Sequence, residues 1–575
     1  MCHACDRKTL AALRAVSRRS LLKIGAMGSA LTALGCQSAF GPERAKRQVF
    51  LARRVHTMDP ARPLAEAVAA EGGRILAVGS REEILGAFGR GSDLIDLGDA
   101  VVVPGFVDPH MHSNFSGIRH WVDVGPFTTT DLEQVRAKLR AAAREVAPGG
   151  WLQAKMLDPS LQPGRPLTRA DLDELAGEVP VFILESNGHL AYANTRACEL
   201  AGVTADTADP PQGRFTRDGA GALTGRLEEP PAFQPFVEVM PSPTAAELVG
   251  LIREDLQDGA RRGCTTLHDC GIGGLFAEQD LTLLDAALES EAPVRYAGML
   301  VSTHMDRWDE LGLRPGQRSE SFHLTGIKAW ADGSNQGRTG YLREPYQGST
   351  GRGTLNYSPE EIRAVVERAH GDGWQVGVHA NGDAAIDLVL EVFAEVIAAH
   401  PRAGHRHRIE HASVLHPEHI EEMARLGISP SFLIGHVHYW GRAFRDELFG
   451  AERARRLDPC ASALAGGLRI SLHSDYNVTP IDPLRCIQNA VVRDMRDGGE
   501  ILAPEERITV EQGLRAMTLD AAWQCQLDHV CGSLEVGKAA DLAVLEEDPF
   551  EVEPSQLQDI AVASSWVAGR RTHGG

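Results

Sequence analysis

His110 and His112 stand one residue apart at the end of the stretch VVVPGFVDPHMH, residues 101–112. The branched residues 101–103 predict a buried strand, which bends at a Pro-Gly pair and resumes before the first histidine. Side chains at positions i and i+2 of an extended strand point the same way, so both imidazoles can reach one metal ion. This spacing predicts a metal site.

Four more side chains that can bind a metal lie where other predicted strands end. They are Lys328 in GIKAWADGS, His379 in VGVH, His411 in RIEH and Asp475 in HSDYNV. In a β/α barrel the carboxyl ends of the strands form one mouth, and catalytic groups gather there. Six such groups at one rim can hold two divalent cations. Imidazole and carboxylate donors suit zinc, with iron or manganese as alternatives.

The elements that must position these groups alternate between strand and helix from residue 104 to residue 529, a pattern typical of an α/β barrel. Helices are expected over 131–146, 244–262, 359–370, 383–399, 417–426 and 460–465, and strands over 179–184, 265–268, 294–301, 323–330, 374–379, 407–410, 428–431 and 469–474. Residues from about 115 to about 260 exceed one β/α repeat, so we expect an insertion over the barrel mouth. Within it, residues 210–235 are rich in Gly, Pro and charge and are expected to form a loop or hairpin.

Short strand patterns flank the barrel at both ends of the chain. Strands are predicted over 48–55, 67–70, 74–78 and 93–97, with a helix over 81–88, and the last segment holds a matching turn and strands. We expect residues 48–103 and 530–573 to pair into one composite β-sandwich. The predicted fold class is therefore α/β, a (β/α)8 TIM-like barrel joined to a small β domain built from both chain ends.

Residues 1–40 have the pattern of an export signal. The segment SRRSLLK at residues 17–23 resembles a twin-arginine signal, and the apolar run after it is too short to span a bilayer. The alternative interpretation is a basic amphipathic helix. The segment ALGC before residue 37 partly resembles a lipoprotein cleavage site, so a lipid anchor at Cys36 is left open. We expect a periplasmic protein whose partners include the twin-arginine export machinery.

Composition argues against some classes of function. The formal net charge of −20 over 575 residues disfavours a nucleic-acid-binding surface, so no nucleic acid is expected as a partner. An apolar fraction of 43% is ordinary for a globular protein. Apart from the pair Cys2 and Cys5, the ten cysteines are scattered, which predicts buried small residues rather than a disulfide framework.

Five motifs follow one another along the chain: PGFVDPHMH, GIKAWADGS, HANGDAA, RIEHA and HSDYNV. Together they resemble the motif set of the metal-dependent amidohydrolase superfamily. More narrowly, they resemble its third family, which includes N-substituted formamide deformylase. The resemblance extends over residues 48–571. It implies a hydrolase of a small-molecule substrate with two divalent metal ions, zinc being the first expectation, and it carries a homodimer as an expectation.

The resemblance also implies a role for each of the six groups. These roles are metal ligation by His110, His112, His379 and His411, bridging of both ions by a carbamate on Lys328, and ligation with proton transfer by Asp475. The first two histidines would bind the more buried ion, and the carbamate would form from carbon dioxide. An ammonium group beside two dications is disfavoured, so the neutral amine that this reaction needs is available.

Three further residues are candidates for substrate binding. His189 in ESNGHLAYAN and Glu228 in TGRLE lie in stretches that resemble the family's segment over the site. A structural histidine and a surface carboxylate are the alternatives. Asn381, two residues after His379, contacts substrate or satisfies a turn. A second His-x-His pair, His436 and His438, has no lysine or carboxylate beside it in the sequence, so we do not predict a metal there.

The sequence thus predicts a metal-dependent hydrolase that cleaves an amide-like C–N bond with metal-activated hydroxide. Related chemistries on the same scaffold are the first alternative: a lactone, cyclic ureide or imine hydrolase, or a deaminase. Lys328 argues against the deaminases, which often use one ion and lack the bridging lysine. An exported, non-catalytic binding protein is the alternative of another class, and an intact set of six ligands argues against it.

Overall fold

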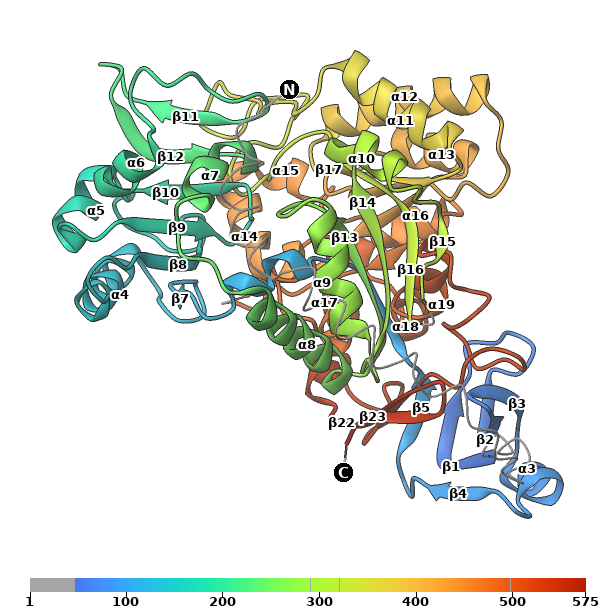
Figure 1. Cartoon of the computed structure of the whole chain (residues 1–575). Helices are drawn as coiled ribbons and strands as arrows, with labels where there is room; N and C mark the ends of the chain where they lie inside the picture. The colour runs from blue at the N-terminus through green and yellow to red at the C-terminus, as the bar shows by residue number, and fades with distance from the viewer. Residues whose placement is uncertain (1–46, 290, 320, 497, 575) are drawn as a thin grey trace. The chain divides into compact units, whose positions relative to one another are not determined.

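The computed structural model describes residues 47–574 except 290, 320 and 497 (Figure 1). The predicted export signal and Cys36 lie outside the described residues. The cysteines within them are all buried and unpaired, as predicted. In the described part of the chain, no helix combines the length and the apolar run that crossing a membrane requires.

Eight parallel strands form the barrel. Their order around the sheet is β6 (Phe106–Met111), β13 (Cys264–Ile272), β14 (Arg295–Val301), β16 (Phe322–Trp330), β17 (Gln375–Ala380), β18 (Arg408–His411), β19 (Ser429–Phe432) and β20 (Ser471–Leu472). The ring is closed just beyond β20, where Met111 pairs with Tyr476 and the Asp475 N–H donates to the His110 carbonyl at 3.0 Å. The predicted TIM-like barrel is confirmed.

Helices follow the barrel strands along the chain. They include α8 (Ala245–Arg261), α9 (Glu278–Leu288), α11 (Pro359–Gly371), α12 (Asp383–Ala399), α13 (Pro417–Leu426), α16 (Cys460–Ala465), α17 (Pro483–Val492), α18 (Val510–Ala516) and α19 (Leu519–Gln524). Capping boxes start several of them, including α8 and α11. There Thr244 and Ser358 accept from the backbone N–H of Glu247 and Glu361, whose side chains bond back. Helices α12, α13 and α16 begin and end at the predicted residues.

The last barrel strand is shorter than predicted. Residues 469–474 were expected to be extended, but β20 covers only Ser471–Leu472. The backbone N–H and the hydroxyl of Ser474 donate to the buried Asp108 carboxylate, at 3.4 and 2.5 Å, instead of continuing the ladder. This contact carries the chain from β20 across to β6 and places Asp475 beside His110.

The insertion forms a sheet of its own, in the order β11-β12-β10-β9-β8-β7 (Figure 1). Its strands are β7 (Val122–Asp123), β8 (Leu152–Leu157), β9 (Val181–Glu185), β10 (Leu190–Ala193), β11 (Arg214–Arg217) and β12 (Leu223–Glu228), and its helices are α4 (Leu132–Glu145), α5 (Arg169–Ala176), α6 (Thr195–Ala201) and α7 (Pro230–Val237). The hairpin expected within 210–235 is β11-β12, but helix α7 was not predicted. Prolines at its first two positions are compatible with a helix because the first turn has no N–H partner to lose.

Both ends of the described chain meet in one mixed sheet, in the order β23-β22-β21-β5-β1-β2-β3 with β4 paired to β1 (Figure 1). The strands are β1 (Arg47–His56), β2 (Leu64–Glu71), β3 (Arg74–Gly79), β4 (Asp93–Asp96), β5 (Val101–Pro104), β21 (Leu542–Leu545), β22 (Val562–Val567) and β23 (Arg570–His573), with α3 at Arg81–Phe88. The expected β-sandwich is therefore one continuous hydrogen-bonded sheet. It encloses its own core, since the rings of Phe50 and Trp566 pack edge to face at 5.0 Å.

Gly105 links this sheet to the barrel between β5 and β6. A Cβ at this position would lie 2.1 Å from the side chain of Thr265 on β13, so only glycine leaves room for this side chain. The chain-end sheet therefore leads directly into the strand that carries the first histidine pair.

Candidate metal centre

The structure brings the six predicted ligands together at the barrel mouth. The Nε2 atom of His110 lies 3.3 Å from His112 Nε2, 3.2 Å from Lys328 Nζ and 3.5 Å from Asp475 Oδ1. His112 Nε2 lies 3.2 Å from the same Asp475 oxygen. These four side chains come from β6, the residue after it, β16 and the segment after β20.

His379 and His411 complete the cluster from β17 and β18. Their ring centroids are 4.5 Å apart, and the ring of His411 lies 5.0 Å from that of His110. The Nδ1 atom of His411 lies 3.9 Å from Asp475 Oδ2. Ligand atoms of His110, His411 and Asp475 are close enough to share one cation.

Burial makes these groups suitable metal ligands. It lowers the pKa of His110, His379 and His411 well below the usual value, and neighbouring positive groups lower it further. Burial by itself raises the pKa of the Asp475 carboxyl, but His112, His473 and Lys328 hold it below its usual range. The cluster therefore contains neutral imidazoles and an ionised carboxylate, the protonation states that metal ligation requires.

Several buried polar atoms around the cluster have no hydrogen-bond partner among the residues that the structure describes. They are Nδ1 of His112, Nδ1 of His411, both ring nitrogens of His473 and Oδ1 of Asp475. Buried polar atoms are rarely left unpaired in folded proteins. Such unpaired donor atoms beside converging imidazoles fit a bound metal.

Glu410 and Arg408 lie beneath the cluster and orient His110. One Glu410 oxygen accepts from His110 Nδ1 at 2.7 Å and from the Arg408 guanidinium at 2.7 Å, and all three side chains are fully buried. Cys270 lies close to the same carboxylate, and burial raises the pKa of its thiol well above the usual value. A neutral thiol and a paired carboxylate are poor ligands, so this group supports the metal centre from behind.

Asn381 holds His379 in place. Its amide nitrogen lies 3.0 Å from His379 Nε2 and donates to the Gly333 carbonyl at 3.0 Å, while its oxygen accepts from the Ser413 hydroxyl at 2.6 Å. Both ends of the amide are thus occupied within the described residues. This arrangement favours positioning of a ligand over direct contact with substrate.

His189 reaches the site from the insertion, but Glu228 does not. His189 lies between β9 and β10 in the sequence. Its ring is 5.0 Å from the ring of His379. The Glu228 carboxylate instead lies 3.6 Å from the guanidinium groups of Arg214 and Arg226. Its contacts within the described chain do not include any of the six ligands.

The neighbouring residue, Glu229, was not singled out by the sequence. Its Oε2 atom lies 2.8 Å from His189 Nδ1, and the residue is buried. Burial lowers the pKa of His189, but the charge of Glu229 and this hydrogen bond raise it above the usual value. A hydrogen-bonded carboxylate–histidine pair, the His189–Glu229 pair, therefore adjoins the candidate metal centre.

The second His-x-His pair has carboxylate neighbours after all. Asp458 and Asp494, distant in sequence, lie 3.8 Å from His436 Nδ1 and 3.5 Å from His438 Nδ1. The sequence argument, that no carboxylate lies near this pair, was therefore wrong, because the fold brings two carboxylates close to it. Neither histidine belongs to a described cluster that could hold a metal.

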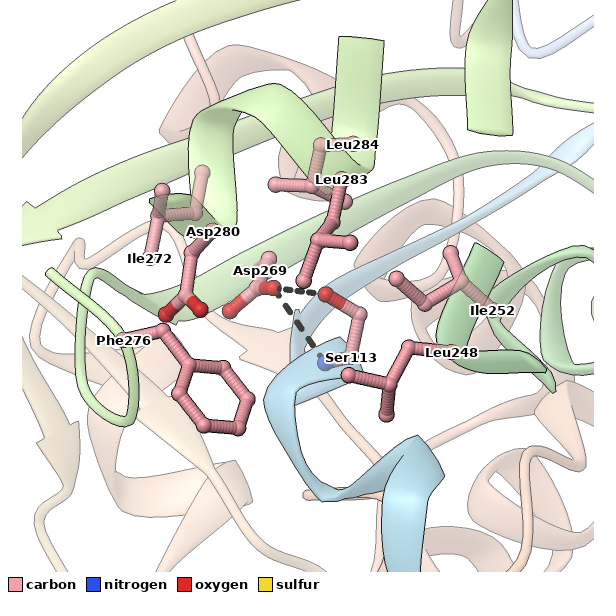
Figure 2. Close-up of a pocket in the computed structure, with 9 residues that line it drawn as sticks. All are labelled: Ser113, Leu248, Ile252, Asp269, Ile272, Phe276, Asp280, Leu283 and Leu284. Atoms are coloured by element: carbon pink, nitrogen blue, oxygen red, sulfur yellow. Dashed lines mark hydrogen bonds between the residues drawn. The ribbon is translucent and has the colours of Figure 1, made fainter. Parts of the chain in front are cut away.

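A small pocket adjoins the site behind His112. Figure 2 shows Ser113 donating from both its N–H and its hydroxyl to Asp269 Oδ2, at 3.2 and 2.5 Å. The other Asp269 oxygen lies 4.0 Å from His112 Nδ1, and burial raises the pKa of the nearby Asp280 to about 7. The remaining lining residues are Leu248, Ile252, Ile272, Phe276, Leu283 and Leu284.

Proteins of known sequence are similar to this chain over most of its length. It is 30% identical to Protein LONG AFTER FAR-RED 3 of Arabidopsis thaliana, with 90% of each chain covered. It is 29% identical to N-substituted formamide deformylase of Arthrobacter pascens, covering 90% of this chain and 96% of the other.

The fold is also shared with a solved structure. An uncharacterized metal-dependent hydrolase from Pyrococcus horikoshii superposes with a TM-score of 0.69 at 23% identity, covering 88% of this chain and 99% of that one. A model of the amidohydrolase family matches residues 93–573, which contain all six candidate metal ligands. The chain therefore belongs to the amidohydrolase family, family 3.

Proposed function

We propose that this protein is a binuclear metal-dependent hydrolase that cleaves an amide-like C–N bond. The observation that carries the proposal is the position of Lys328. Its side chain is fully buried, its Nζ atom lies 3.2 Å from His110 Nε2, and no carboxylate pairs with it within the described residues. A buried, unpaired ammonium is costly, whereas a carbamate on this lysine would be a negatively charged metal ligand.

The residues present fit two divalent cations. One cation would be held by His110, His112 and Asp475, and the other by His379 and His411. The carbamate of Lys328 would bind both cations. Zinc suits this donor set. When bound, the two cations supply a hydroxide at neutral pH and polarise the carbonyl group of the substrate.

The chain's own residues would then manage the proton and the substrate. The Asp475 carboxylate lies within reach of both histidines of the first pair, so it can take a proton from water and return it to the leaving nitrogen. His189, held by Glu229 above His379, can contact the carbonyl oxygen of the substrate. The insertion would thus supply a substrate-binding group that the barrel lacks.

The choice of substrate class is supported by a similar protein. The Arthrobacter relative is named N-substituted formamide deformylase and matches nearly the full chain, which favours open-chain amides. Imidazolonepropionases match at 26–28% identity over 34–49% of this chain. This shorter match makes cyclic amides the second candidate class.

A substrate panel with matched variants tests the proposal. Zinc-loaded protein is assayed against N-substituted formamides, other N-acyl compounds and cyclic amides, with metal content measured on the same samples. We expect turnover of at least one amide, about two metal ions per chain, and a carbamate signal in the ¹³C NMR spectrum after incubation with ¹³CO2. Lys328→Ala should lose the carbamate signal and part of the metal. Metal-free active protein would contradict the proposal, and metal-loaded protein without turnover would favour a binding protein.

We also propose that residues 17–23 direct twin-arginine export to the periplasm. Replacing Arg18 and Arg19 together by lysine should leave the protein in the cytoplasmic fraction, whereas the wild type should appear in the periplasmic or membrane fraction. Equal distribution of the two proteins would contradict this proposal.

A further inference from the structure

We propose that Glu229 is a positioning residue that fixes the His189 ring over the metal centre. The proposal rests on the proposed function, in which His189 contacts the carbonyl group of the substrate. In this proposal the carboxylate that acts beside His189 is that of Glu229 and not that of the adjacent Glu228.

Two hydrogen bonds join Glu229 to His189. Its side chain accepts from His189 Nδ1 at 2.8 Å, and its backbone N–H donates to the His189 carbonyl at 2.7 Å. The two residues come from the ends of neighbouring strands, β10 and β12, which pair antiparallel. Ring and backbone of the histidine are thus both held by one residue.

Glu229 does not do what its place in the helix favours. It is the N-cap residue of α7, a position where Ser, Thr, Asp or Asn usually accepts a backbone N–H of the first turn. Here the side chain makes no such bond, and the backbone has a φ of 65°, a region that non-glycine residues rarely adopt. The carboxylate is directed to His189 and not to the helix that follows it.

Gly333 lies close to this carboxylate. A Cβ at Gly333 would lie 2.1 Å from Thr339 Oγ1 and 2.4 Å from Glu229 Oε1, so the glycine leaves room for both side chains. Gly333 in turn accepts at its carbonyl from Asn381, the residue that holds His379. Glu229 therefore connects the substrate-facing histidine to the positioning of a metal ligand.

The arrangement determines which ring nitrogen faces the substrate. Because Nδ1 of His189 donates to Glu229, Nε2 is left without a hydrogen bond in the described chain, and the side chain keeps 13% of its surface exposed. The partner of one ring nitrogen sets the orientation of the other. Loss of Glu229 would leave the ring free to rotate away from the carbonyl oxygen.

A double-mutant cycle tests this inference. With an active amide from the panel, Glu229→Ala should lower kcat/KM by about ten- to a hundredfold, because loss of an orienting partner has effects of this size. This decrease should lie mainly in kcat, because the contact between His189 and the carbonyl oxygen of the substrate strengthens as negative charge develops on that oxygen. In the His189→Ala background, Glu229→Ala should cause almost no further loss. Effects that multiply in the double variant would overturn the inference.

Two further variants sharpen the cycle. Glu229→Gln keeps an oxygen that can accept from Nδ1, so it should recover most of the activity lost in Glu229→Ala; it also serves as the test variant if Glu229→Ala does not fold. A loss as large as that of Glu229→Ala would count against positioning through this hydrogen bond. Whatever effect Glu228→Ala has should multiply with that of His189→Ala, because in the described structure the Glu228 carboxylate faces Arg214 and Arg226 and has no hydrogen bond or ion pair with the His189 ring.

A binding measurement separates this inference from the proposed function. Calorimetry with benzohydroxamate, a carbonyl probe that binds metals, does not need turnover. We expect Glu229→Ala to weaken the zinc-loaded protein's affinity for the probe about tenfold, and His189→Ala to remove that difference. If no amide is hydrolysed but this pattern appears, the proposed function fails and the positioning role stands. Equal affinities for the wild type and Glu229→Ala would overturn the role itself.

Discussion

At the scale of single residues, Asp475 is the group for which ligation and proton transfer can be separated. Asp475→Asn keeps an oxygen that can bind metal, and the four histidines remain. The amide cannot accept a proton, so we expect near-normal metal content with kcat reduced by about 10²- to 10⁴-fold. Metal analysis and steady-state kinetics on one preparation check this. A variant with wild-type kcat would rule out the proton-transfer role.

The Glu410–Arg408 pair gives a second prediction at this scale. Glu410→Gln leaves the buried Arg408 guanidinium without its counter-charge, which typically destabilises a protein by about 3–5 kcal/mol. It also weakens the acceptor that orients His110, so metal affinity should fall about 10- to 100-fold. Urea unfolding and metal titration measure the two effects.

A matched double variant distinguishes these effects. Adding Arg408→Met to Glu410→Gln removes the unpaired charge, so stability should partly recover while metal affinity stays low. An unchanged urea midpoint in Glu410→Gln would contradict the prediction.

Residue spacing predicted which candidate ligands meet at the barrel mouth but not the residues that hydrogen-bond to them. The i, i+2 rule and the ends of apolar strands located His110, His112 and His379, because strand geometry repeats regularly. Glu229 was missed for a local reason: β12 ends at Glu228, and the positive φ of the next residue breaks the alternation of faces. A pattern of period two cannot show such a change of direction.

At the scale of elements, a long and regular apolar stripe predicted a helix better than a short segment did. Helix α12 has a long buried stripe and was predicted to the residue, whereas the short α7 begins with two prolines that look like a loop signal. The end of β20 depends on the contact of Ser474 with Asp108, far away in the sequence. Tertiary contacts of this kind leave no local signal.

His407, just before β18, gives a pH prediction for the base of the barrel. The Nε2 atom of His370 faces the His400 carbonyl at 2.7 Å and must donate to it, so its Nδ1 accepts from His407 Nε2 at 2.7 Å. The other nitrogen of His407 accepts from the Val376 N–H at 3.0 Å. Neither ring nitrogen of His407 can take a proton without breaking a bond, and burial lowers its pKa well below the usual value.

The sign of the pH effect follows from this depressed pKa. The unfolded chain protonates His407 near pH 6.5, but the folded chain does not, so stability is complete above that pH and is lost as pH falls. Between pH 7.5 and 5.5 the contribution of His407 should fall by about 1.4 kcal/mol. Urea unfolding of metal-free wild type and His407→Gln at both pH values isolates this difference. A stability difference that grows toward low pH would contradict it.

At the scale of the whole molecule, the candidate metal centre joins parts of the chain that are far apart. Its ligands come from β6, near the beginning of the barrel, through the segment after β20, which also closes the ring. The sequence predicted that both chain ends pair, because each ended in unpartnered strand patterns. It could not show that they form one continuous sheet, since strand order depends on pairings between residues hundreds of positions apart.

Removal of metal should therefore affect the entire barrel and not only catalysis. Metal bound at 100 times its dissociation constant stabilises the folded state by about 2.7 kcal/mol, because the ligands converge only when the chain is folded. We expect a chelator to abolish turnover and to lower both the melting temperature and the urea midpoint of the wild type. Zinc with bicarbonate should restore all three, while zinc without carbon dioxide should restore them only in part. Lys328→Ala is the control, because its response to zinc should not depend on bicarbonate. Unchanged stability after complete metal removal, verified by elemental analysis, would show that the six side chains do not hold the barrel strands together through a cation.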